Sequence, residues 1–198
     1  MINEVLIASN NPDKLEELKT LLAGLPLNLH ILSEFPLLPP TIEDQDSIAG
    51  NAMKKALEAA KHSGLLAVAD DTGLFIDALN GQPGVYAARF AGEGCSYADN
   101  RNKVLAMLQG TSNRKASFKT AMALAAPEGI LAVVEGCIEG NITNSERGNS
   151  GFGYDSIFEI NGVSYAEMDS ITKNQISHRA KAMEAMVPIL KSIVNMDL

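Results

Sequence analysis

The chain has 198 residues, long enough to bury one sizeable hydrophobic core. Its 46% hydrophobic and 20% charged residues are ordinary for a soluble globular protein. The net charge of −8 argues against a nucleic-acid polymer as partner, because such binding depends on cations that neutralise phosphates. No apolar run approaches the roughly 18 residues of a membrane span, and the N-terminus lacks a signal-like pattern, so we expect a cytoplasmic protein. Cys95 and Cys137, without CxxC spacing, are expected to be reduced thiols.

The hydrophobic pattern predicts strands and helices in alternation, followed by a hairpin. The expected elements, in chain order, are a strand at 2–8, a helix from Pro12 that ends at Gly24 and Pro26, a strand at 27–32, a helix at 47–62, a strand that begins at Leu65, a helix at 95–108 that stops at Gly110, strands at 116–126 and 130–142, and a helix at 177–194. The two long strands suit an antiparallel hairpin, and Pro188 should bend the last helix. The pattern indicates an α/β fold with a mixed central sheet, flanking helices and a β-hairpin.

The run LLAVADDTGL ends a short apolar stretch in two aspartates. Open α/β sheets place ligands beyond the carboxyl ends of such strands. Asp70 and Asp71 should point to opposite sides of an extended chain, so we expect one of them to face a ligand. The alternative is a polar turn whose side chains bond their own backbone.

The first junction between a strand and a helix reads SNNPDK. Asn11 suits the N-cap and Pro12 suits the first helical position. Free backbone N–H groups beside Lys14 would then form an anion site. The alternative is simply a well-capped helix.

The second predicted helix places Lys55 beside its apolar face. A lysine there either extends to water or meets a buried anion, and general burial preferences favour extension to water. Asn51 lies one turn earlier on the same edge. Upstream, Glu43, Asp44 and Asp46 form an acidic loop that could supply a ligand for a hard metal ion, or could simply be solvated.

Two later segments suit recognition of a planar base. Glycines flank Phe152 and Tyr154, so an aromatic ring there could stack on a base, and Asp155 could accept from the base edge. The alternative is a turn that tucks Phe152 into the core. At the last helix, His178 and Arg179 place cations against the helix dipole, which makes sense if an anion or a base carbonyl is their partner.

The ordered set of motifs SNNPDK, NAMKKA, ADDTGL, GVYAARFAG, GFGYDSIF and TKNQISHR resembles the Ham1-like family of inosine triphosphate pyrophosphatases. The resemblance spans nearly the whole chain. It implies a single domain over 1–198, a substrate cleft between two lobes, and a homodimer. It also implies Mg²⁺-dependent hydrolysis of ITP, dITP and XTP to the monophosphate and pyrophosphate, which removes damaged purines from the nucleotide pool.

Roles follow from the resemblance residue by residue. It implies that Asp71 is metal ligand and general base, that Glu43 is the other acidic metal ligand, and that Lys55 is a catalytic lysine at the phosphates. Asp70 is expected to support Asp71. The implied substrate contacts are Ser9, Asn10, Asn11, Asp13, Lys14, Thr72, Phe152, Gly153, Tyr154, Asp155, Lys173, His178 and Arg179.

The chain departs from the family pattern at four positions. Gly50 stands where glutamate is frequent, which bears on the metal network, and Ile48 stands where an aromatic residue is common. Ser150 and Ser156 replace a usual glycine and proline, which should chiefly affect loop stiffness. Two alternatives stay open: a pyrophosphatase for pyrimidine or modified triphosphates, and a non-catalytic nucleotide sensor.

Overall fold

The structure, a computed structural model, describes residues 3–193, and these divide into two compact units. The first unit contains residues 3–71, 120–136 and 179–193, and the second contains 72–119 and 137–178. Three long strands, β3 (Leu66–Ile76), β5 (Lys115–Ala126) and β6 (Gly129–Ile142), contribute residues to both units. Within the described residues, no helix is long and apolar enough to span a bilayer.

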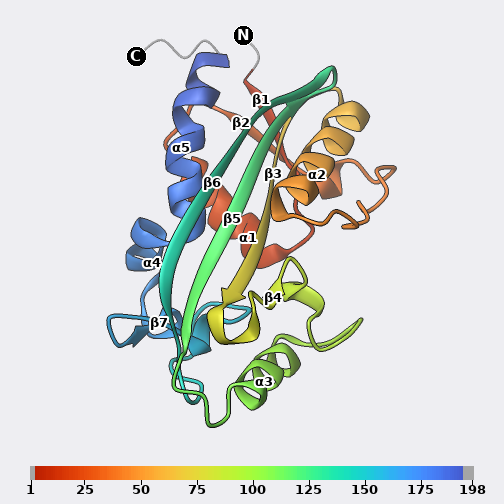
Figure 1. Cartoon of the computed structure of the whole chain (residues 1–198). Coiled ribbons are helices and arrows are strands. Elements are labelled where there is room, and N and C mark those ends of the chain that lie inside the picture. The colour runs from red at the N-terminus through yellow and green to blue at the C-terminus, as the bar shows by residue number, and fades with distance from the viewer. Residues whose placement is uncertain (1–2, 194–198) are drawn as a thin grey trace. The chain divides into compact units, whose positions relative to one another are not determined.

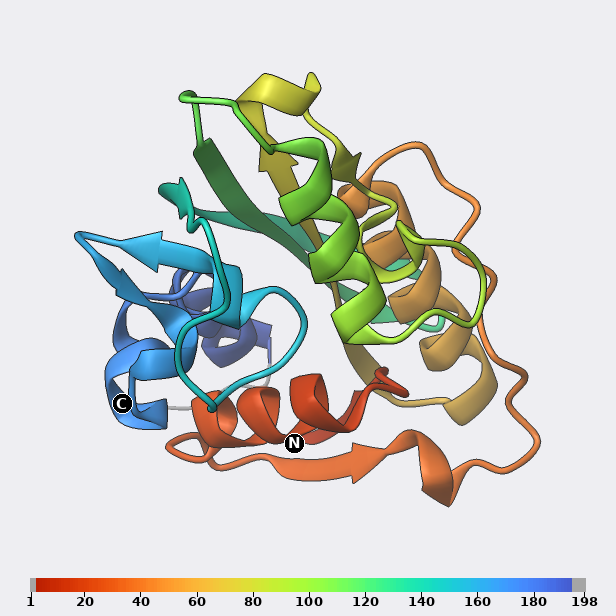
Figure 2. The same ribbon diagram turned by 90° about the horizontal axis from the view of Figure 1, so that it is seen from below.

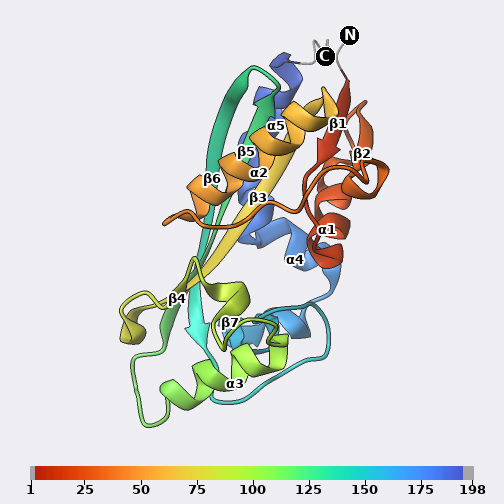
Figure 3. The same ribbon diagram turned by 90° about the vertical axis from the view of Figure 1, so that its right-hand side faces the viewer.

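The first unit is a parallel strand pair extended by the long strands and covered by helices. Its other elements are β1 (Glu4–Ile7), α1 (Pro12–Leu22), β2 (Asn28–Ile31), a 3-10 turn (Leu32–Glu34), α2 (Ile48–Ser63) and α5 (His178–Ile193). The strand order is β2-β1-β3-β5-β6, with β1 parallel to both neighbours. Figures 1 and 3 show α2 and α5 on opposite faces of these strands.

Alternation along the strands divides the core of this unit between the two faces. Val5 and Ile7 of β1 share a cluster with Leu18 of α1 and with Met183 and Met186 of α5. On the amphipathic α2, the buried residues are Ile48, Asn51, Ala52, Ala56, Ala59 and Ala60. The small alanines let α2 lie close to the sheet, and Ser47 caps its start by accepting from the Gly50 N–H.

The second unit is built around the far ends of the long strands. Its own elements are β4 (Pro83–Gly84), α3 (Tyr97–Met107), β7 (Phe158–Ile160), β8 (Val163–Ser164), α4 (Ser170–Ile176) and 3-10 turns at Asp77–Leu79, Ala87–Arg89, Asp155–Ile157 and Tyr165–Glu167. Antiparallel pairs join β3 to β4, β6 to β7 and β7 to β8. Its core gathers Leu74, Val104, Phe118, Phe158 and Tyr165.

Most predicted elements are confirmed, including the mixed sheet and the flanking helices. Strands β5 and β6 are neighbours joined by a two-residue turn, which only an antiparallel hairpin allows. Cys95 and Cys137 are free thiols. Pro188 lies inside α5, and the helix continues through it to Ile193. The predicted elements also included Ile2 and Val194, which lie outside the described residues.

The structure differs from the sequence prediction at one strand boundary and in short elements that were not predicted. Strand β3 does not stop before its aspartates but continues to Ile76, because Leu74 and Phe75 pair with Gly84 and Pro83 of β4. Tertiary pairing therefore overrides the turn preference of Asp, Thr and Gly. The short helix α4 was not predicted; Asp169 caps it by accepting from the Thr172 N–H.

A cluster at the edge of the first unit couples its stability to pH. His30 on β2 lies between two carboxylates, with Nε2 2.6 Å from Glu4 and Nδ1 2.8 Å from Glu34. These hydrogen bonds, that to Glu4 first, raise the pKa of His30 above its ordinary 6.5. Protonated His30 thus contributes stability fully below about pH 6.5, and the contribution is lost as pH rises through the raised pKa.

We therefore expect His30→Gln to lower the Tm more at pH 6 than at pH 8.5. Thermal unfolding followed by circular dichroism measures both values on the variant and on the parent chain. An equal drop at the two pH values would contradict the ionic role of His30.

Candidate active site

The two adjacent aspartates of β3 point to opposite faces of the strand, as predicted. Asp70 and Asp71 are buried, with relative exposures of 2% and 5%. Both lie within the strand, so the alternative of a polar turn is wrong. Because a buried carboxylate needs compensating cations or donors, each aspartate defines its own cluster.

The Asp70 cluster joins α1, β3 and α5. Lys14 Nζ lies 3.3 Å from Asp70 Oδ2, and Arg179 donates to the same oxygen from Nη2 at 3.0 Å and from Nε at 3.2 Å. Arg179 also donates to Glu17 of α1. Burial raises the pKa of Asp70, but the charges of Lys14 and Arg179 outweigh burial and hold that pKa well below its usual range. Asp70 is therefore ionised and holds two cations beside it, and its supporting role toward Asp71 stays a prediction.

The Asp71 cluster joins α2, β3 and the acidic loop. Lys55 Nζ lies 3.1 Å from Asp71 Oδ1 and 3.0 Å from Glu43 Oε1. Asn51 donates to the other Asp71 oxygen at 3.1 Å. The Lys55 side chain is only 12% exposed, so the preference for extension to water is wrong, and the lysine meets the buried Asp71 and the half-buried Glu43 instead. Burial lowers the pKa of Lys55, but the charges of Asp71 and Glu43 outweigh burial and raise it overall.

The acidic loop follows one face of α2 in the antiparallel direction. Loop residues that increase in number contact helix residues that decrease in number, at the spacing of one helical face. The four contacts are Thr41 with Glu58 (2.6 Å), Glu43 with Lys55 (3.0 Å), Asp44 with Lys54 (2.8 Å) and the Gln45 N–H with Asn51 Oδ1 (3.0 Å). Glu43 thus reaches the Asp71 cluster because its loop is held along α2.

The donor set of this cluster fits a hard divalent cation. Within residues 3–193, no group of three or more His, Cys, Asp or Glu side chains is placed to hold a metal ion. Mg²⁺ does not require such a group, because it usually takes one or two carboxylates and completes its shell with water and substrate phosphates. The carboxylates of Glu43 and Asp71, which share the Lys55 ammonium, provide such a pair.

The SNNPDK segment forms the start of α1 as predicted. Asn11 is the N-cap and Pro12 occupies the first turn. The expected free N–H groups are not all available, because Asn11 Oδ1 accepts from the N–H of Asp13 at 2.9 Å and of Lys14 at 3.3 Å. The Asn11 N–H donates in turn to Ser9 Oγ. An incoming anion would therefore meet the side chains of this segment before its backbone.

The glycine-flanked loop places its two aromatics differently. Phe152 is half-buried, whereas Tyr154 is buried and donates from its hydroxyl to the Ala87 carbonyl at 2.7 Å. The buried Asp155 accepts from Lys173 Nζ at 2.7 Å and from the Phe152 N–H at 2.9 Å. Lys173 Nζ lies 4.9 Å from the centre of the Phe152 ring. Lys173 thus links the loop carboxylate to the face of an aromatic ring.

The cationic start of α5 divides between the two units. His178, 4% exposed, stacks on Phe118 in the second unit, with ring centres 4.6 Å apart and planes at 15°. Arg179 belongs to the first unit, and its anionic partners are protein carboxylates. Asp70 is one of those partners. These partners belong to the chain itself, and the predicted ligand anion or base carbonyl at this helix start stays a prediction.

The predicted residues gather in two groups, one in each unit. Lys14, Glu43, Lys55 and Asp71 belong to the first unit, where Ser9 and Asp13 are half-buried and Asn10 is exposed. Thr72, half-buried on β3, and the loop residues with Lys173 and His178 belong to the second. Glu17 and Phe118 were not predicted as residues of the site. An acid one turn after Lys14 was the only signal for Glu17, and Phe118 reads like any buried aromatic.

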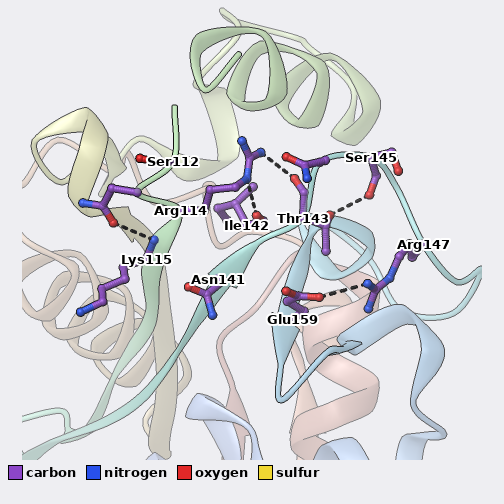
Figure 4. Close-up of a pocket in the computed structure, with 11 residues that line it drawn as sticks. Ser112, Arg114, Lys115, Asn141, Ile142, Thr143, Ser145, Arg147 and Glu159 are labelled. Atoms are coloured by element: carbon purple, nitrogen blue, oxygen red, sulfur yellow. Dashed lines mark hydrogen bonds and ion pairs between the residues drawn. The ribbon is translucent and has the colours of Figure 1, made fainter. Parts of the chain in front are cut away.

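A separate open cavity of about 620 Å³ lies in the second unit and contains no predicted site residue (Figure 4). The two arginines that line it already have protein partners. Arg114 donates to the carbonyls of Leu108, Ile142 and Thr143, and Arg147 pairs with Glu159 at 3.1 Å and with Glu167 at 3.0 Å. These contacts fit a structural role in joining strand ends to neighbouring turns.

The fold is that of an α/β protein, and the Asp70 and Asp71 clusters of its first unit bring together carboxylates and lysines that suit an anionic ligand and its metal ion. The Ham1 family model matches residues 5–189. A dITP/XTP pyrophosphatase from Thermoanaerobacter sp. (strain X514) is 42% identical over 184 residues, covering 91% of this chain and 92% of that protein. Another from Desulforamulus reducens is 42% identical over 194 residues, covering 96% of each. Among solved structures, a HAM1 protein from Coxiella burnetii matches with a TM-score of 0.87 and 39% identity, covering 96% of this chain and 98% of that one. The chain belongs to the Ham1 family, as its motifs predicted.

The buried Arg179 yields a stability prediction. Arg179→Met should lower the free energy of unfolding by about 3–5 kcal/mol, because it leaves the carboxylates of Asp70 and Glu17 without their guanidinium. Urea denaturation measures the loss. The matched control is Arg147→Ala, whose more exposed ion pairs should contribute about 1 kcal/mol or less. Equal losses in the two variants would contradict a buried structural role for Arg179.

Proposed function

We propose that this chain hydrolyses the triphosphates of non-standard purines, ITP, dITP and XTP, to the monophosphate and pyrophosphate. Its relatives over nearly the whole chain are dITP/XTP pyrophosphatases. The observation that carries the proposal is the buried Asp71 carboxylate, which shares the Lys55 ammonium with Glu43. This arrangement combines a buried acid, a cation for phosphate and a carboxylate pair for a divalent ion.

The phosphate end of the substrate is assigned to the first unit. A triphosphate carries a charge near −4, so it needs positioned cations inside a chain whose net charge is −8. Lys14 and Lys55 supply two, and Ser9, Asn11 and Asp13 surround the start of α1 beside Lys14. Burial lowers the pKa of Lys14, which means that burial disfavours its charged form. A further anion beside Asp70 would stabilise that charged form.

Glu43 and Asp71 are the residues proposed to hold Mg²⁺. When bound, the ion would neutralise phosphate charge and polarise the anhydride. Lys55 lies between these carboxylates and is free to turn its ammonium toward phosphate oxygens once a divalent ion compensates the acids. Gly50, which replaces a frequent glutamate, contributes no third carboxylate here.

The chemical step is assigned to Asp71. Its carboxylate orients a water molecule and accepts its proton as the water oxygen attacks the α-phosphorus. The bond from the α-phosphorus to the bridging oxygen breaks, and the electron pair leaves with pyrophosphate. Asn51 and Lys55 hold the two Asp71 oxygens, which orients the carboxylate for this task.

The base end of the substrate is assigned to residues of the second unit. Phe152 supplies a stacking face, and Lys173 or His178 donates to the 6-oxo group of the purine. Adenine presents an amino group there instead, and a buried donor left unpaired costs about 1–3 kcal/mol. Arg179 is proposed as a further substrate contact, as the family resemblance implies, and Asp70 and Glu17 hold its guanidinium in place.

The remaining expectations from the family resemblance are kept as part of the proposal. They are one catalytic domain over 1–198, a homodimer and a cytoplasmic location. The match of the family model to residues 5–189 supports the single catalytic domain. Light scattering on the purified chain measures the oligomeric state.

A panel of triphosphates with Mg²⁺ separates this function from its two alternatives. We expect pyrophosphate release from dITP, ITP and XTP to exceed that from dATP and UTP by about tenfold or more in kcat/KM, since each unpaired donor costs about 1–3 kcal/mol. Rapid turnover of UTP would favour the pyrimidine pyrophosphatase. Binding of dITP without release of pyrophosphate would favour the sensor.

The general base is tested by Asp71→Asn, which keeps the shape of the side chain. We expect kcat for dITP to fall by about 10²–10⁴-fold, the usual contribution of a general base, with an unchanged circular dichroism spectrum. The matched control is Glu93→Gln, which removes one carboxylate from a side chain that is 91% exposed and should leave kcat unchanged. Near-normal turnover by Asp71→Asn would overturn the assignment.

A further inference from the structure

The loop of residues 148–156, the base loop, cannot maintain its conformation by backbone preference alone. Gly148, Gly151 and Gly153 have φ values of +79°, +75° and +60°. Glycine is the residue type that loses most conformational freedom on folding, so contacts must order this segment. At Gly151 a Cβ atom would lie 2.2 Å from Asp155 Oδ2, so the glycine is needed there.

Backbone hydrogen bonds within the base loop and to Ala166 order part of it. The Phe152 N–H donates to Asp155 Oδ2 at 2.9 Å, and the Asp155 N–H donates back to the Phe152 carbonyl at 3.1 Å. The Ser150 N–H donates to the Ala166 carbonyl at 3.0 Å. Gly153 lies between Phe152 and Asp155 in the sequence. The backbone conformation of this glycine therefore affects where the Phe152 ring is held.

Arg101 of α3 binds the base loop at this glycine. Its Nη1 donates to the Gly153 carbonyl at 2.9 Å, across 52 residues of sequence. Its Nε forms an ion pair with Glu146 Oε1 at 3.0 Å, and Glu146 Oε2 accepts from Ser156 Oγ at 3.0 Å. One guanidinium therefore holds the middle of the loop directly and its last residue through Glu146. Figure 2 shows α3 in green and the chain that follows β6 in cyan.

Tyr97 adds a second contact from the same helix face. It lies four residues before Arg101, so the two side chains are neighbours on α3. The Tyr97 and Phe152 rings are 6.1 Å apart at 44°. Helix α3 itself is fixed by a capping box at Ser96 and Asp99 and by Val104 in the core. It can therefore act as a rigid support.

The Arg101 guanidinium is partly shielded from solvent, which strengthens its contacts to the loop. The Arg101 side chain is 18% exposed, and Glu146, which it contacts, is 40% exposed. Arg101 is the first cause of a lowered Glu146 pKa, with burial opposing it and Ser156 supporting it. A charged donor on a carbonyl is a stronger hydrogen bond than a neutral one.

We propose that Arg101 is a positioning residue that, with Tyr97, holds the base loop so that Phe152 and Asp155 keep a binding-competent arrangement. The bracing of the loop follows from the contacts alone. Its consequence for substrate rests on the proposed function, in which Phe152 stacks on the base. Arg101 then sets the affinity and the selectivity for the base while touching neither base nor phosphate.

The first test measures the order of the loop without any substrate. The chain contains no tryptophan, so Phe152→Trp places a single tryptophan, with its own fluorescence, in the base loop. In this background we expect Arg101→Ala to raise the Stern–Volmer constant for acrylamide quenching about twofold, because loss of the contact frees a low-stability segment. Lys103→Ala is the matched control: it removes another cation of α3, one that contacts Phe90. Quenching in Arg101→Ala equal to that in Lys103→Ala would overturn the bracing.

The second test separates a positioning role from a merely structural one. In the parent chain, we expect Arg101→Ala to raise KM for dITP about tenfold while kcat changes less than about threefold, because the residues at the phosphates are untouched. The ratio of kcat/KM for dITP to that for dATP should fall, and Arg101→Lys should restore part of both values. Lys103→Ala should change neither. An unchanged KM, or a loss in kcat alone, would overturn the role in base recognition.

Two further comparisons keep the outcomes distinct. If the parent chain releases pyrophosphate from no triphosphate, the proposed function fails, while the quenching result still decides the bracing. If Arg101→Ala does not fold by circular dichroism, Glu146→Gln replaces it, since it weakens the ion pair and keeps the shape. Unchanged quenching and unchanged KM in a folded Glu146→Gln variant would then overturn the proposal.

Discussion

Two carboxylates on consecutive residues of a buried strand impose the constraint on which the first unit depends. The strand directs Asp70 and Asp71 to opposite faces, so different side chains contact each of them: Lys14 and Arg179 contact Asp70, and Lys55 contacts Asp71. Each must be compensated where it is buried, since an unpaired charge there costs several kcal/mol. The cations come from three helices: Lys14 from α1, Lys55 from α2 and Arg179 from α5. The two aspartates of β3 therefore require each of those helices to place a cationic residue beside the strand.

The base loop also contains a buried carboxylate that is compensated by a cation. Asp155 is buried with Lys173, and the ammonium also lies near the Phe152 and Tyr165 rings at 4.9 and 5.7 Å. A buried pair of this kind contributes orientation more than net stability, because desolvation offsets much of the Coulomb attraction. In both units, then, polar residues at the candidate site are held by opposite charge and hydrogen bonds, while apolar packing determines the surrounding elements.

Local patterns in the sequence were sufficient for most elements and for the capped start of α1. They failed where distant chain segments decide. The extension of β3 beyond Asp71 depends on pairing with Pro83 and Gly84, which no local preference reveals. General burial preferences predicted that Lys55 extends to water, because such preferences contain no information on its contacts with Glu43 and Asp71. The contact between Arg101 and Gly153 spans 52 residues and had no sequence signal.

The antiparallel contacts between the acidic loop and α2 have a consequence for chain length. From Thr41 to Gln45, each contact meets α2 at helical spacing, so one inserted or deleted residue would shift every following partner and withdraw Glu43 from Lys55. Just before this stretch, Leu37 is 85% exposed and follows no such register. Natural variation in length should therefore accumulate around Leu37 and be excluded a few residues later, although both stretches look like one continuous surface loop.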